Sequence, residues 1–216
     1  MRADLHAHTV LSDGVFIPAE LVRRAAVLGH RAIAITDHVD MANLEHVVSC
    51  VVKAAELSSD EIQVIPGVEV THVPPAKMDA VISKARALGA QIIVVHGETV
   101  TEPVAPGTNL KAASNPDVDV LAHPGFLTAE EAELAKSNGV AIEITGRSGH
   151  GITNGHVADV AMEAGATMVV NSDAHTVGNL MDRDRAFSVA LGAGIPSGMA
   201  KKAIGKNHMD IIKRRT

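Results

Sequence analysis

The feature that most restricts the fold of this chain is a repeated alternation of short apolar segments with segments of helical periodicity. Apolar runs of strand length occupy residues 31–36, 62–70, 91–95, 118–122, 140–144 and 167–171, after an opening strand that carries His6 and His8. Runs that are apolar on both faces are typical of buried parallel strands joined by helical crossovers. The pattern predicts seven parallel strands covered by helices, one strand short of a TIM barrel.

Helix-start and helix-stop signals lie between these runs. Pro18 begins a helix that Gly29 ends, and Thr128 with Glu131 forms a capping-box pattern. Asn154 is expected to cap the helix that follows the sixth strand. Further helices are expected at residues 43–57, 76–88, 109–113 and 184–191.

The order of these elements predicts the fold class and the domain organisation. No glycine-rich phosphate loop follows the first strand, which excludes the usual dinucleotide-binding fold. We expect an α/β chain that forms a distorted, TIM-like barrel as a single domain over residues 1–216. A basic tail, about residues 201–216, is interpreted as a solvated helix end whose cations complement the helix dipole.

Charge and composition restrict the partners. The net charge of −6 argues against a general polyanion binder, because nucleic-acid affinity comes mainly from Lys and Arg. The chain has no Trp or Tyr, which leaves few surfaces for base stacking. No signal-peptide pattern or membrane-length apolar run is present. We expect a cytoplasmic protein without a membrane partner, for which nucleic acid is not favoured.

Potential metal ligands occur where the predicted strands end. His6 and His8 share one face of the opening strand, since side chains alternate, and Asp173 and His175 repeat this spacing after the last strand. The C-terminal strand ends of a parallel barrel converge on one mouth. The side chains expected there are His6, His8, Asp13, His38, Glu69, His96, His123, Asp173 and His175. These are too many for one ion, and they suit zinc, manganese or iron, so we expect two or three divalent ions.

These residues lie in motifs that resemble the PHP family, named for polymerase and histidinol phosphatase. The motifs occupy residues 4–9, 12–14, 35–38, 67–69, 95–96, 122–124 and 171–175. The resemblance implies a distorted (β/α)₇ barrel with a trinuclear metal centre. By the same resemblance His6, His8, Glu69 and Asp173 would hold one ion, Glu69, His96 and His123 a second, and Asp13, His38 and His175 a third. Many members have histidine where this chain has Asp13, which is a harder ligand.

The resemblance implies phosphomonoester hydrolysis by a hydroxide held between the metals, with Asp173 and His175 as catalytic ligands. Arg147, in a glycine-rich segment beyond the sixth strand, is expected to bind the substrate phosphate. Asp37 precedes His38 and could either orient a metal-bound imidazole or cap its own loop.

The expected substrate is a small phosphorylated metabolite such as histidinol phosphate. A nuclease or nucleotide phosphatase of the same family is one alternative. A non-catalytic scaffold subunit of a ribonucleoprotein is another, and it predicts missing ligands and a basic surface, whereas this chain has all nine ligands and a negative net charge. His72, Glu98 and His150 are interpreted as solvated loop residues.

Overall fold

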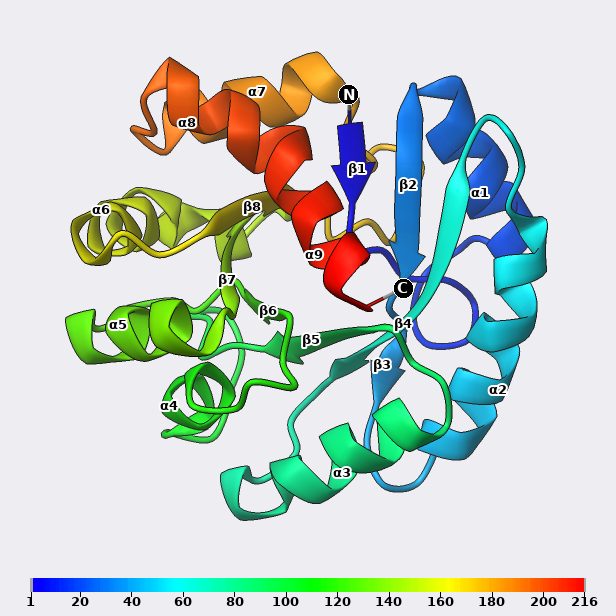
Figure 1. Ribbon diagram of the computed structural model, residues 1–216, viewed down its shortest axis with the longest axis horizontal. Helices are drawn as coiled ribbons and strands as arrows, with labels where there is room; N and C mark the ends of the chain where they lie inside the picture. The colour runs from blue at the N-terminus through cyan, green and yellow to red at the C-terminus, as the bar shows by residue number, and fades with distance from the viewer. Residues whose placement is uncertain (1, 216) are drawn as a thin grey trace.

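Eight parallel strands form one sheet that curls into a nearly closed barrel in the computed structural model, which describes residues 2–215 (Figure 1). The strands are β1 (Arg2–Asp4), β2 (His30–Ile35), β3 (His38–Val39), β4 (Gln63–Val70), β5 (Ile92–His96), β6 (Val120–Ala122), β7 (Ala141–Thr145) and β8 (Met168–Asn171). The order is β1-β2-β4-β5-β6-β7-β8, with β3 paired to β4. Because β3 follows β2 after two residues, the expected seven strands are all present and the second is interrupted.

The opening strand differs from the expectation. It ends at Asp4, so His6 and His8 lie in the segment beyond it. That segment stays extended at Ala7, which forms a parallel bridge to Ala174, and the His8 amide donates to the Ala174 carbonyl at 2.9 Å. These contacts join the first and last strands at the mouth of the barrel.

Helices surround the barrel, as the alternation predicts (Figure 1). They are α1 (Pro18–Val27), α2 (Leu44–Ala54), α3 (Pro75–Ala87), α4 (Thr108–Ala113), α5 (Ala129–Asn138), α6 (Asn154–Ala164), α7 (Arg183–Gly192), α8 (Ser197–Lys201) and α9 (Asn207–Arg215), with 3₁₀ turns at Ala55–Leu57 and His150–Thr153 and a π-helical turn at Lys202–Lys206. Pro18 starts α1, and Thr128 and Glu131 form the expected capping box of α5. Asn154 does not cap α6: its side-chain amide instead bonds the Thr145 backbone, because it lies inside the first turn.

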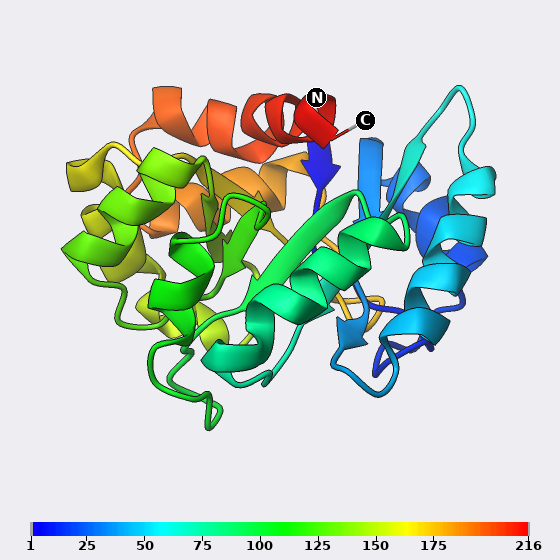
Figure 2. The ribbon, with the colours of Figure 1, turned by 60° about the horizontal axis from the view of Figure 1, so that its bottom comes forward.

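The C-terminal segment corrects the expectation of a solvated tail. Figure 2 shows α9 lying across the end of the barrel at which the strands begin. Ile211 and Ile212 are 3 % and 2 % exposed and pack with apolar side chains of the barrel interior, such as Ile65 and Ile92. Of the basic residues of α9, Lys213 and Arg214 are exposed, whereas Arg215 is partly buried and donates from Nε to the buried Asp119 at 2.6 Å. Within the described residues, no helix is long and apolar enough to cross a bilayer.

Candidate metal centre

All nine predicted ligands meet at the mouth of the barrel. His38 lies in β3, Glu69 in β4 and His96 at the end of β5, while the other six lie in the segments that follow strands. His123 and Asp173 have positive φ angles of 28° and 48°, a backbone conformation that non-glycine residues rarely adopt. Such strain is common where a structure must aim a side chain at a functional site.

The inner part of the centre is arranged around Glu69, which is fully buried. Its Oε1 lies 3.3 Å from His6 Nε2 and 3.6 Å from His123 Nε2, and its Oε2 lies 3.6 Å from His8 Nε2. Asp173 Oδ1 lies 3.4 Å from His8 Nε2 on the same side. Candidate ligand atoms of His6, His8 and Glu69 all lie within 4.8 Å of one another, as do those of His6, His123 and Asp173.

A second group shares Glu69 with the first. Candidate ligand atoms of Glu69, His96 and His123 lie within 4.8 Å of one another, and the rings of His96 and His123 are 4.5 Å apart in an edge-on arrangement. A carboxylate placed between two sets of imidazoles can bridge two ions.

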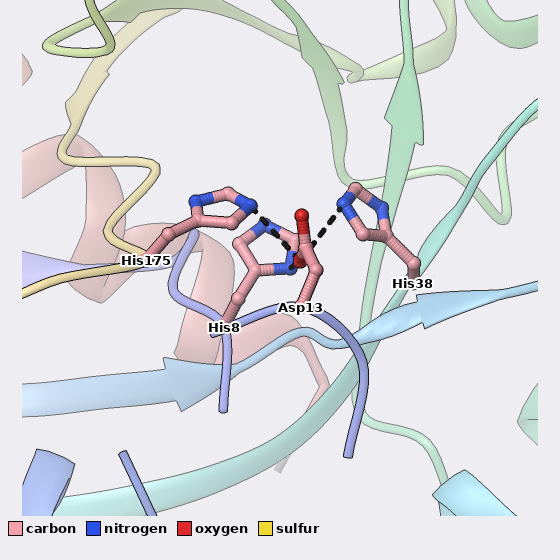
Figure 3. Close-up of side chains that lie close together, drawn as sticks. All are labelled: His8, Asp13, His38 and His175. Atoms are coloured by element: carbon pink, nitrogen blue, oxygen red, sulfur yellow. Dashed lines mark ion pairs between the residues drawn. The ribbon is translucent and has the colours of Figure 1, made fainter. Parts of the chain in front are cut away.

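The outer group is formed by His8, Asp13, His38 and His175 (Figure 3). Asp13 Oδ1 lies 3.1 Å from His175 Nε2 and 3.4 Å from His38 Nε2, and the Asp13 side chain is 54 % exposed. The loop that carries Asp13 folds tightly back on His8, since a Cβ on Gly14 would lie 2.5 Å from the His8 carbonyl oxygen. Through Asp13, this group is exposed to solvent, whereas the candidate ligands of the inner groups are buried.

Asp37 holds the loop that carries Asp13. Its carboxylate accepts from the Thr9 amide and hydroxyl, both at 2.7 Å, and from the Ser12 hydroxyl at 2.6 Å. His38 Nδ1 lies instead 2.7 Å from both Thr71 Oγ1 and Glu69 Oε2. Of the two roles considered for Asp37, the described contacts correspond to capping of the loop.

The chemistry of these donors fits divalent cations. Within the described residues, His6 Nε2, His8 Nε2 and both oxygens of Glu69 are buried and lack a partner in hydrogen-bond geometry, although they lie in ion-pair range of one another and of His38. Buried polar atoms are rarely left in this state, and these atoms face one another. Imidazole and carboxylate together suit zinc, manganese or iron. Divalent ions would be coordinated by these nitrogen and oxygen atoms, which have no partner in hydrogen-bond geometry among the described residues.

The pKa shifts of Glu69 and His38 show how the carboxylates and imidazoles of the site interact when they bind protons instead of metal ions. Burial alone would raise the pKa of Glu69, but the neighbouring His6 and His38 hold it well below its usual value. Burial alone would lower the pKa of His38, but Glu69 and Asp13 raise it to about 10. The carboxylates thus bind cationic imidazole, and metal binding must displace those protons.

Two acidic residues of the site were not among the sequence predictions. Glu143 Oε2 lies 2.8 Å from His6 Nδ1 and leaves His6 Nε2 directed at Glu69. Glu102 lies at the rim, with its oxygens 3.1 Å from His96 Nε2, 3.4 Å from His150 Nε2 and 3.3 Å from His72 Nε2. Glu143 could have been found as an inward-facing acid in an apolar strand, whereas Glu102 lies in an irregular segment without a distinguishing pattern.

A pocket at the mouth is lined by residues of all three ligand groups, and Arg147 and His150 contribute to its lining. His150 is 7 % exposed, which corrects its interpretation as a solvated residue, and its ring stacks 4.4 Å from that of His123. The Arg147 guanidinium has no hydrogen bond or ion pair within the described part of the chain, so it is available to an anion.

Barrel, strand-end ligands and an arginine-lined cavity together define a metal-dependent phosphoesterase fold. The PHP domain family matches residues 4–100. An uncharacterized protein, MJ1295 of Methanocaldococcus jannaschii, is 49 % identical over 99 % of this chain and 100 % of its own length. The chain belongs to the PHP domain family, as its motifs indicate.

Two further similarities are one of sequence and one of fold. Ribonuclease P protein component 3 of Methanosarcina mazei is 31 % identical over 66 % of this chain, which spans 55 % of that component. The crystal structure of histidinol phosphate phosphatase from Lactococcus lactis, complexed with zinc, L-histidinol and phosphate, superposes with a TM-score of 0.67. It covers 90 % of this chain and 94 % of that one at 15 % identity, a likeness of fold.

Proposed function

We propose that this protein is a metal-dependent phosphoesterase that hydrolyses a small phosphomonoester, with residues 1–216 acting as one domain. The observation that carries the proposal is the set of buried imidazole and carboxylate groups whose candidate ligand atoms lie within 4.8 Å of one another at the barrel mouth. A site retained only as a remnant of a lost activity would be free to replace these donors with apolar residues.

The ligand groups that the geometry brings together support a trinuclear assignment. His6, His8, Glu69 and Asp173 would hold one ion, Glu69, His96 and His123 a second, and Asp13, His38 and His175 a third. When bound, such ions lower the pKa of water to about 7 and neutralise charge on a phosphoryl group. His8 Nδ1, 3.9 Å from Asp13, extends the third group beyond the expected residues.

The protein's own part in the reaction is to orient the substrate. Arg147 provides a planar, permanently charged donor for phosphoryl oxygens at the cavity wall. His123 and His150, whose rings stack 4.4 Å apart, form another part of the pocket lining. The single arginine among the lining residues suits the one phosphoryl group of a compact ester such as histidinol phosphate, whereas a nucleic-acid backbone would require several cations.

A second candidate is a subunit of a ribonucleoprotein, favoured by the 31 % identity to the ribonuclease P component. In that role the chain would bind RNA or protein, and the barrel mouth would not need to turn over substrate. The complete ligand set and the net charge of −6 favour the enzyme.

The test is phosphate release from a panel of phosphomonoesters and nucleotides with added Mn²⁺ or Zn²⁺, with His123→Ala as the control. We expect release from a small ester that the substitution abolishes. Absence of release from every ester by protein that demonstrably binds metal would reject the phosphomonoesterase, and RNA binding by the same sample would favour the subunit.

A further inference from the structure

A chain of buried hydrogen bonds connects the C-terminal helix to the candidate metal centre. His208 Nε2 in α9 lies 2.9 Å from Asn171 Oδ1 at the end of β8. Asn171 Nδ2 lies 2.8 Å from Glu143 Oε2 in β7, and the same oxygen lies 2.8 Å from His6 Nδ1. All four side chains are fully buried, so water does not compete for these bonds.

The direction of each bond follows from one backbone amide. The Leu5 N–H can only donate, and it lies 3.0 Å from the side-chain atom of Asn171 that His208 also faces. That atom must therefore be the amide oxygen, which leaves the amide nitrogen of Asn171 to donate to Glu143. His208 consequently donates from Nε2, and the Glu143 carboxylate accepts from both Asn171 and His6.

This arrangement determines which nitrogen of His6 can bind a metal. With its Nδ1–H donated to Glu143, His6 presents Nε2 to the inner group, 3.3 Å from Glu69 Oε1. A carboxylate on the far nitrogen of a metal-bound imidazole fixes its orientation and increases its basicity. Asn171 and His208 in turn hold Glu143 in place.

We propose that His208 is a positioning residue for the metal centre, acting through Asn171 and Glu143 on His6, so that docking of α9 and metal binding are coupled. The inference rests on the proposed metal site and adds to it a dependence on the opposite end of the barrel. Because coupling is reciprocal, metal binding must also stabilise the docked position of α9.

Three variants of the full-length protein test the coupling. His208→Met removes the donor at similar volume, and His208→Gln keeps an amide donor that can reach Asn171. Ile211→Ala is the matched control, because it loosens the packing of α9 in the barrel without touching the hydrogen-bonded chain. The readouts are Zn²⁺ affinity by calorimetry, melting temperature of the metal-free protein, and amide exchange in α9 with and without Zn²⁺.

We expect H208M to weaken Zn²⁺ binding about tenfold, the lower part of the range for loss of an outer-shell partner. H208Q should restore most of the affinity, and I211A should lower the melting temperature without this loss. A double-mutant cycle with Glu143→Gln should be non-additive. Zn²⁺ should also slow exchange in α9 of the wild-type protein and not of H208M.

The coupling is rejected if H208M binds Zn²⁺ as the wild type does, or if the effects of H208M and Glu143→Gln on Zn²⁺ affinity are additive. Equal weakening of binding by I211A would reject the route through His208 and assign the effect to packing of α9 alone. Should H208M not fold, His208→Asn, whose amide is too short to reach Asn171, takes its place against H208Q. If the wild-type protein does not bind Zn²⁺, the proposed metal centre itself is wrong. If the wild type binds Zn²⁺ and H208M binds it equally well, only the coupling is wrong.

Discussion

The two ends of the barrel contain the same kind of side chain, histidine, in opposite electrostatic surroundings. At the mouth, Glu69 and Asp13 outweigh burial and raise the pKa of His38 to about 10. At the opposite end, burial and the positive charge of Arg2 lower the pKa of His30 to about 4. The mouth thus combines a cationic His38 with neutral imidazoles such as His8, whose pKa burial lowers to about 4, while at the closed end burial lowers the pKa of both His30 and His208.

The difference shows which end contains the candidate metal site. The closed end pairs its buried Arg2 with Asp4 at 2.7 Å and fills the remaining space with Ile211 and its neighbours. Buried polar atoms without a hydrogen-bond partner occur at both ends, as His8 Nε2 and His30 Nε2 show. Among the described residues, however, only the mouth brings histidine and carboxylate atoms within 4.8 Å of one another in groups of three or more, so the candidate metal site is assigned to the mouth.

Glu69→Gln removes the anion at the centre of the mouth and should have the largest effect. Loss of an outer-shell partner costs about 10–100-fold in activity, and loss of a shared ligand should exceed this. Phosphate release measures the activity, and the melting temperature should no longer rise with added Zn²⁺. Wild-type activity in this variant would contradict a bridging role for Glu69.

Arg147→Ala should separate substrate binding from metal binding at the mouth. The lost charge-assisted hydrogen bonds predict an increase in KM of about tenfold or more for a phosphate ester. Bound metal, measured by elemental analysis, should not change. An unchanged KM would exclude Arg147 as the phosphate contact, and Arg147→Lys should recover part of the binding as the charge-preserving control.

Asp13→Ala tests whether the exposed outer group differs from the buried inner ones. We expect the variant to lose one ion per chain and to keep the others, since Asp13 contacts only the outer group. Asp13→His, the residue found in many family members, should restore the ion and shift its preference from Mn²⁺ toward Zn²⁺. Loss of every ion from D13A would show that the groups do not bind independently.

The closed end should contribute to the acid stability of the metal-free protein through His30. The unfolded chain binds a proton at position 30 below about pH 6.5, whereas folded His30 does so only near pH 4. Stability should therefore fall as pH decreases from 6.5 to 4, by up to about 3 kcal/mol from this residue. Urea unfolding of His30→Gln should show a shallower decrease, whereas an unchanged slope would exclude His30 as a source of the pH dependence.

Much of the site could be predicted from the sequence because its signals are local. Continuous apolar strands and helix caps are properties of short segments, and they predicted the barrel that the structure shows. The strand-end positions of Glu69, His96 and His123 followed from the convergence of parallel strands. No distant contact had to be known for either inference.

The remaining features depend on contacts between distant parts of the chain. Glu143 contacts His6 across 137 residues of sequence, and no local pattern reports that distance. The tail was interpreted from its charges as solvated, whereas Ile211 and Ile212 close the barrel because they meet an apolar interior built from seven strands. The sequence by itself determined the repeating elements and the ligand types. Only the tertiary structure decided which buried groups share a proton, a metal or a hydrogen bond, since those energies depend on distance in space.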